Sequence, residues 1–221
     1  LGQEATIDLD RLVTETVRGR HFRHTLNKFD KEGYRVERFT PPHRPELLDQ
    51  VESVSRNWLT LPGHHERSFT LGSFRRDYMN QCPLFVVLDP AGQVIAFANE
   101  IPSYRAGEAT IDLMRHRIDA PNGTMDYLFL KLMMNFKEHG YRLFDLGLAP
   151  FAGVGGDPTD PLPERLMHQL SERSNKVFSY RGIHGYKAKF DPLWEDRFLI
   201  HQGGTPGLIK SALAILRLTE R

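Results

Sequence analysis

The 221-residue sequence contains one cysteine, Cys82. A single thiol has no partner for an intrachain disulfide, which excludes disulfide-stapled scaffolds and indicates a reducing compartment. Long apolar runs are missing too, since the best, 84–88 and 212–216, fall far short of the roughly 20 residues that a helix needs to cross a bilayer. The polar start, Gly2-Gln3-Glu4, does not resemble a secretory signal peptide. Leu1 in place of an initiator Met indicates a piece of a longer protein.

The chain has the composition of a folded globular domain, with 40% apolar and 26% charged residues. The net charge is only +1, but the charges are unevenly distributed. Nine Lys/Arg face four acids between residues 11 and 44, and five face none between 173 and 189. These two basic clusters suit RNA or an anionic lipid surface, although solvated helix faces are an equally good interpretation.

Hydrophobic periodicity predicts alternating strands and helices. The clearest helix begins near 124 and ends at Gly140, with apolar residues spaced three and one apart. A turn sequence at 89–92 joins two apolar strands into a hairpin. The other expected elements are a strand ending at 7–10, a basic helix at 11–32, strands at 34–39, 109–117 and 142–148, helices at 45–58 and around 166–170, a strand-like stretch over 177–200, and a C-terminal helix at 207–221.

This order predicts an α/β (α+β) fold, a mixed sheet flanked by helices. A strand–helix–strand crossover links 109–117 to 142–148, a layout typical of GNAT-type acetyltransferases. The turn at 118–123 carries Asp119 and one glycine, however, where a coenzyme A pyrophosphate needs several glycines. We therefore expect an acyl donor other than acetyl-CoA, and no cofactor.

Five motifs, in matching order from about residue 5 to 200, carry a family likeness. They are 96–99 (AFAN), 111–115 (IDLMR), 119–126 (DAPNGTMD), 146–150 (LGLAP) and 186–195 (YKAKFDPLWE). Together they resemble phosphatidylglycerol lysyltransferases, also called multiple peptide resistance factors.

The resemblance implies a membrane flippase followed by a catalytic region of two tandem GNAT-like domains at the cytoplasmic face of the bacterial membrane. That region transfers lysine or alanine from aminoacyl-tRNA to phosphatidylglycerol, which lowers binding of cationic antimicrobial peptides. On this basis 1–33 ends the first GNAT-like domain and carries the linking basic helix, 34–202 is the second, and 203–221 is an amphipathic C-terminal helix. The implied partners are aminoacyl-tRNA, anionic phospholipid and the N-terminal membrane domain.

Two residues rank first as catalytic candidates, Asp112 and Arg115, which by resemblance line the aminoacyl site. Asp112 suits the α-ammonium of the amino acid or a proton, and Arg115 suits a lipid phosphate or the tRNA 3′ end. In a regular strand residues i and i+3 face opposite ways, so this pair converges only across a bulge or at a strand end. An ordinary ion pair at the strand end is the alternative.

The remaining candidates have equally good structural interpretations. Asp126 follows Thr124, a plausible N-cap, and either acts in catalysis or complements the helix dipole. Asn99 either donates an amide in the cleft or caps a bulge. Arg181, Lys187 and Lys189 either clamp tRNA phosphates or the lipid headgroup, or form a solvated face. The ten histidines lack a ligand pattern, so no metal site is expected.

Three functions remain open from the sequence: the lipid aminoacyltransferase, a GNAT-like transferase acting on a soluble or peptidoglycan amine as Fem-type enzymes do, and a noncatalytic RNA- or membrane-binding module. The C-terminal helix offers a basic stripe beside an apolar one, which suits either an anionic bilayer surface or packing on its own domain.

Overall fold

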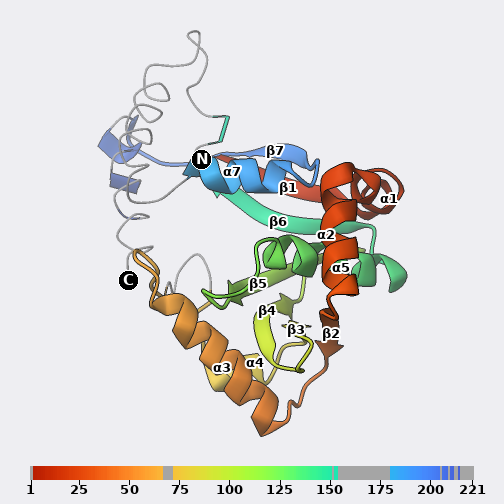
Figure 1. Ribbon diagram of the computed structural model, residues 1–221. Helices are drawn as coiled ribbons and strands as arrows, with labels where there is room; N and C mark the ends of the chain where they lie inside the picture. Colours follow the sequence, from red (N-terminus) through yellow and green to blue (C-terminus); the bar gives the residue numbers. More distant parts are fainter. Residues whose placement is uncertain are drawn as a thin grey trace. The chain divides into compact units, whose positions relative to one another are not determined.

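A computed structural model describes residues 2–66, 72–150, 152–153, 180–204, 206–208, 210, 211 and 214, and at 180 and 181 only the backbone (Figure 1). The chain forms two compact units, one made of Leu1–Ile7 with Asp145–Arg221 and the other of Asp8–Phe144. Among the described residues, no helix is long and apolar enough to span a membrane.

In the Asp8–Phe144 unit, four strands pair antiparallel in the order β2 (Arg35–Phe39), β3 (Leu84–Leu88), β4 (Val94–Ile101) and β5 (Glu108–His116). The predicted hairpin is confirmed, and its turn is closed by the Asp89 carboxylate, which accepts backbone N–H groups from Ala91 and Gln93. All five residues of β3 are buried, which explains why this strand reads as an unbroken apolar run.

Helices cover both faces of this four-stranded sheet. Leu84, Val86 and Leu88 pack with α3 (Pro45–Leu59) and with Met79 of α4 (Arg76–Met79). The alternate residue Phe85 meets Phe136 of α5 (Thr124–Glu138), with ring centroids 5.2 Å apart. Because successive strand residues face opposite ways, α3 and α4 lie on one face and α5 on the other. The predicted helices at 45–58 and from 124 are confirmed.

The single basic helix expected over 11–32 is wrong in detail. The segment is α1 (Leu9–Thr14), a 3₁₀ turn η1 (Thr16–Arg18) and α2 (Arg20–Lys31). Gly19, with φ −55° and ψ 144°, has extended backbone and separates the two helices. The cause is local, because glycine and the β-branched residues before it are weak helix formers. Helix α2 buries Phe22, Thr25 and Phe29 and packs on α5.

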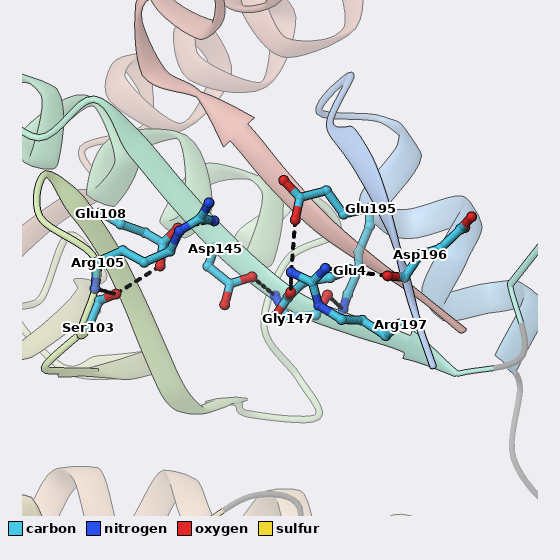
Figure 2. A network of polar contacts seen from close by, with 10 residues as sticks. Glu4, Ser103, Arg105, Glu108, Asp145, Gly147, Glu195, Asp196 and Arg197 are labelled. Carbon is cyan, nitrogen blue, oxygen red and sulfur yellow. Dashed lines mark hydrogen bonds and ion pairs between the residues drawn. The ribbon is translucent and has the colours of Figure 1, made fainter. Parts of the chain in front are cut away.

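The loop between β4 and β5 is tied down by Glu108, which is itself almost fully buried. Its carboxylate accepts the Ser103 hydroxyl at 2.8 Å and pairs with the Arg105 guanidinium at 3.2 Å (Figure 2).

In the other unit, β1 (Gly2–Asp8) lies between β6 (Leu143–Pro150) and β7 (Leu193–Arg197), and pairs antiparallel with β7. The strand-like stretch expected over 177–200 is wrong at its start, because α7 (Tyr180–Ala188) precedes β7. The residues described here that are not exposed recur at helical spacing, and the aromatic pattern concealed this period; they are Ile183, His184, Tyr186, Lys187 and Phe190.

The mixed α/β class with helices flanking the sheet is confirmed by these elements. The helix expected around 166–170 lies outside the described residues. Of the helix expected at 207–221, the described residues 207, 208, 210, 211 and 214 are helical, and its apolar stripe at 209, 213 and 216 lies outside the described residues.

Candidate functional site

A β-bulge in β5 brings the two leading candidates to one face of the sheet. Ala98 of β4 lies opposite Met114 and Glu100 lies opposite Ile111, so Asp112 and Leu113 together face the single residue Asn99. One extra residue reverses the alternation of side chains along the strand. Asp112 and Arg115 therefore both point toward the side covered by α3 and α4. The bulge that the sequence named as one condition for their convergence is present, but the two side chains have different partners.

Two donors from a distant segment of the unit bind the Asp112 carboxylate, and Asn99 binds one of these donors. Its Oδ1 accepts the backbone N–H of Gly72 at 2.8 Å, and its Oδ2 accepts the Tyr78 hydroxyl at 2.7 Å. The Tyr78 oxygen also accepts Nδ2 of Asn99 at 3.2 Å. Burial, followed by the hydrogen bond to the Asp112 anion, raises the pKa of Tyr78 well above its ordinary value, so the phenol stays a donor.

Asn99 has the bulge role that the sequence allowed. Its Oδ1 accepts the backbone N–H of Leu113 at 2.8 Å. This N–H is the group that the extra residue removes from the regular hydrogen-bond ladder between β4 and β5. Asn99 itself is fully buried. Its amide nitrogen faces Tyr78, so Asn99 belongs to the surroundings of Asp112.

Asp112 has no cationic partner among the described residues. Its carboxylate is only partly exposed, and both of its hydrogen bonds come from uncharged donors. A carboxylate removed from water is normally paired with a cation or a metal ion. The described residues hold no group of three His, Cys, Asp or Glu side chains that fits a metal. The arrangement therefore suits an incoming cationic group.

Arg115, in contrast, is fully engaged inside the unit. Its guanidinium is 3% exposed and donates to both carboxylate oxygens of Glu66, at 2.8 and 2.6 Å, and to the Ser55 hydroxyl at 2.6 Å. It also lies over the Trp58 ring, 4.8 Å from the centroid. Burial acts to raise the pKa of Glu66, but the hydrogen bond and charge of Arg115 outweigh it and lower that pKa below its ordinary value. Arg115 thus forms an ion pair, as the alternative interpretation allowed, but its partner is Glu66 rather than Asp112.

Asp126 belongs to the opposite face of the sheet, on α5. It is almost fully buried in the first turn of that helix, and its Oδ2 lies 3.0 Å from Nε2 of His21. Thr124 is not the N-cap, since it is the first helical residue and Gly123, at φ 97°, precedes the helix without a side-chain cap. A carboxylate here complements the positive end of the helix dipole. The structure does not bring Asp126 together with Asp112.

The three basic candidates of the second cluster lie in the other unit, with Arg181 and Lys187 on α7 and Lys189 directly after its end. The Lys187 ammonium points inward and donates to the carbonyls of Gly147 and Leu148, both at 2.8 Å. Burial lowers the pKa of Lys187 to about 8, against the opposing charges of Asp145 and Glu4. Lys189 is exposed, with its ammonium 4.7 Å from the Tyr186 ring centroid. Arg181 lies on α7, and its side chain is outside the described part of the chain.

Lys187 meets β6 at an irregular point. Gly147 has φ +77°, a conformation that favours glycine, and its N–H donates to the Asp145 carboxylate at 2.7 Å (Figure 2). Nearby on the paired strands β1 and β7, Figure 2 shows Arg197 beside Glu4 and Glu195. Lys187 is thus a buried support of β6 rather than part of a solvated basic face.

Sequence reasoning missed Ser55, Glu66, Gly72 and Tyr78, which contact the two leading candidates. Three of them fall in the segment 61–81, which has no clear periodicity. The polar side chains of Glu66 and Tyr78 in that segment marked them as candidates, but the local sequence does not show which strand residues they contact.

Comparisons with known proteins agree on one family. The family model "Phosphatidylglycerol lysyltransferase, C-terminal" matches residues 1–201. The phosphatidylglycerol lysyltransferase of Staphylococcus epidermidis is 35% identical over 218 residues, covering 99% of this chain and 26% of that protein. That of Bacillus subtilis is 33% identical over 202 residues, covering 91% of this chain and 23% of that protein. The chain thus spans about a quarter of the length of these curated relatives.

Two solved structures support the same assignment. L-PGS from Bacillus licheniformis superposes with a TM-score of 0.84 at 35% identity, covering 100% of this chain and 66% of that one. The C-terminal domain of a putative lysylphosphatidylglycerol synthetase from Agrobacterium fabrum gives a TM-score of 0.76 at 33% identity, with 97% and 63% covered. The chain therefore belongs to the phosphatidylglycerol lysyltransferase family and corresponds to its C-terminal region.

Proposed function

We propose that this chain carries the aminoacyl-transfer site of a phosphatidylglycerol aminoacyltransferase. The enzyme would move lysine or alanine from aminoacyl-tRNA to the headgroup of phosphatidylglycerol, at the cytoplasmic face of the bacterial membrane. The family match over residues 1–201 carries this proposal. The part-buried Asp112 carboxylate supports it, because no cation pairs with Asp112 among the described residues and every aminoacyl ester presents an ammonium group.

The reaction is a transesterification. The headgroup hydroxyl oxygen attacks the ester carbonyl carbon of aminoacyl-tRNA, and the bond from that carbon to the terminal ribose oxygen breaks. The hydroxyl proton ends on the ribose oxygen, so the reaction needs no oxidant, reductant or cofactor. The lipid gains an ammonium group, and its lower negative charge weakens binding of cationic antimicrobial peptides.

We assign the residues roles that follow from their surroundings. Asp112 binds the ammonium of the amino acid and so orients the ester for attack. Arg115 holds the segment around residue 66 against β5 through its ion pair with Glu66. While this ion pair is intact, Arg115 does not bind a phosphate. Asn99 keeps the bulge formed. Catalysis by Asp126 stays a prediction, as does binding of phosphates or lipid headgroups by Arg181, Lys187 and Lys189.

The charge of α2 supports a polyanionic partner such as tRNA. Arg20, Arg23 and Lys31 are exposed on this helix, and no carboxylate pairs with them among the described residues. Lys and Arg side chains that are free of local ion pairs are available to neutralise phosphates. In the family organisation, residues 1–33 would hold the end of a first GNAT-like domain together with this linking helix, and 34–202 would form the second GNAT-like domain. Residues 203–221 would form an amphipathic C-terminal helix, and a membrane domain would lie upstream.

The test is transfer of radiolabelled amino acid from lysyl-tRNA and alanyl-tRNA to phosphatidylglycerol vesicles. This chain and a version extended upstream are assayed side by side. Label in the lipid phase with one tRNA supports the proposal and identifies the donor. Label only with the extension shows that an upstream segment completes the site. Label on a soluble amine but never on lipid favours the Fem-like transferase, and binding without any transfer favours the noncatalytic module.

A further inference from the structure

The orientation of Asp112 depends on a hydrogen-bond chain whose direction is determined by the backbone. Asn99 Oδ1 accepts the Leu113 N–H, so the amide must present its NH₂ group to Tyr78. The Tyr78 oxygen then acts as an acceptor toward Asn99, and its single proton is left for Asp112. Since a backbone N–H cannot reverse its role, Tyr78 has only one hydrogen-bonding state in this arrangement.

Two of the lone pairs on the Asp112 carboxylate are occupied. Gly72 N–H uses one on Oδ1 and Tyr78 O–H uses one on Oδ2. A carboxylate has about four such positions, so about two remain beyond the donors that the described residues supply. Both occupied positions are taken by neutral groups, which leave the full negative charge in place. A primary ammonium group, with three N–H donors and a positive charge, matches what remains.

Gly72 shows how closely the carboxylate is held. A Cβ added at Gly72 would overlap Oδ2 of Asp112 and come within 3.1 Å of the Tyr78 ring. Glycine is therefore required here for the approach of its backbone, and Asp112 cannot turn without losing one of its two donors. The carboxylate is fixed before any ligand arrives, which is the condition for selective binding of a small cation.

We propose that Tyr78 is a positioning residue that holds the Asp112 carboxylate, together with Asn99 and Gly72, in the orientation that binds a primary ammonium group of the aminoacyl substrate. The inference rests on the proposed function for the identity of that substrate. The ammonium has two possible sources, the α-amino group shared by all aminoacyl esters and the side chain of lysine.

The chain provides a matched control in Tyr127. Its hydroxyl also donates to a carboxylate, Asp30 Oδ1 at 2.6 Å, and its pKa is also raised by burial and by that carboxylate. Tyr127 lies on α5, across the sheet from Tyr78. Tyr127→Phe thus removes the same kind of hydrogen bond from the same unit, without touching Asp112.

The experiment measures binding of lysinamide, alaninamide and Nα-acetyl-lysinamide by calorimetry, with the unmodified chain, Tyr78→Phe and Tyr127→Phe. We expect Tyr78→Phe to weaken binding of the amides about tenfold, the loss of one charge-assisted hydrogen bond. We expect Tyr127→Phe to bind within twofold of the unmodified chain. Binding of alaninamide but not the acetylated amide identifies the α-ammonium, and the reverse identifies the lysine side chain.

Equal binding by Tyr78→Phe and the unmodified chain overturns the inference, as does equal weakening in both variants or no binding by the unmodified chain. Gly72→Ala is a second variant and should weaken binding by displacing Asp112. In the transfer assay, Tyr78→Phe should raise KM for aminoacyl-tRNA more than it lowers kcat. If ammonium binding depends on Tyr78 but no amino acid is transferred to lipid, the inference stands and the proposed function is rejected. If lipid transfer occurs at the same rate with Tyr78→Phe, the proposed function stands and the inference is rejected.

Discussion

Replacing Glu66 by glutamine tests the most heavily engaged group near the site. The substitution keeps the shape of the side chain but removes the charge that faces the 3% exposed Arg115. Breaking one partner of a buried ion pair costs about 3–5 kcal/mol. Glu66 itself is 35% exposed, and Ser55 and Trp58 still contact the guanidinium, so solvent and these contacts reduce the cost. We expect Glu66→Gln to lower the free energy of unfolding by about 2 kcal/mol at pH 7.

The pH dependence of this loss has a definite sign. The pKa of Glu66 is lowered in the folded protein below the ordinary 4.5. Its contribution is therefore fully present above pH 4.5 and is lost as the pH falls through the lowered value. The unmodified chain and Glu66→Gln should differ most near neutral pH and converge in acid.

Urea unfolding of the unmodified chain, Glu66→Gln, Arg115→Met and the double variant measures the effect and the coupling. We expect the double variant to lose less free energy of unfolding than the two single variants lose together, because it contains no unpaired buried charge at this place. Equal stability of Glu66→Gln and the unmodified chain at pH 7, with superimposable pH curves, would refute the reasoning.

Two further predictions concern other basic groups. The pKa of Lys187 is lowered to about 8 from 10.5, so between these pH values the unfolded chain binds more protons and the free energy of unfolding should rise by about 3 kcal/mol. In urea unfolding from pH 7.5 to 10.5, Lys187→Met should lack that rise in the free energy of unfolding. If the free energy of unfolding changes with pH in the same way in Lys187→Met and the unmodified chain, the lowered pKa of Lys187 is contradicted. Changing Arg20, Arg23 and Lys31 of α2 to alanine should weaken tRNA binding and flatten the slope of log affinity against log salt by about 2 to 3, since each lost phosphate contact contributes about 0.7–0.9. Filter binding at several salt concentrations measures this, and an unchanged slope would exclude α2 from the tRNA contact.

Local sequence patterns predicted most of the strands and helices, because burial on a sheet or a helix face imposes a period on the residues themselves. The hairpin at 84–98 and helix α5 are of this kind. The prediction was wrong at α7, where aromatic residues at helical spacing were interpreted as a strand, and at Gly19, where one extended residue divides a helix.

The site was predictable only in part. Asp112, Arg115 and Asn99 lie in motifs that resemble the family, but their geometry depends on a bulge, which is a property of two paired strands rather than of one. Tyr78 and Gly72 reach Asp112 from 34 and 40 residues away in a segment without periodicity. Contacts of this kind follow from tertiary packing, and local sequence carries little sign of them.

The central claim is that Asp112 belongs to a site that transfers an amino acid from tRNA to phosphatidylglycerol. Its most direct test is single-turnover transfer of labelled lysine to phosphatidylglycerol vesicles by the upstream-extended protein, comparing the unmodified sequence with Asp112→Asn. Asparagine keeps the size and an acceptor oxygen but removes the charge. We predict transfer by the unmodified protein and a rate at least about 100-fold lower in Asp112→Asn, the scale on which enzymes lose rate when one positioned polar group is removed. Equal rates in the two proteins, with tRNA bound by both, would contradict the account.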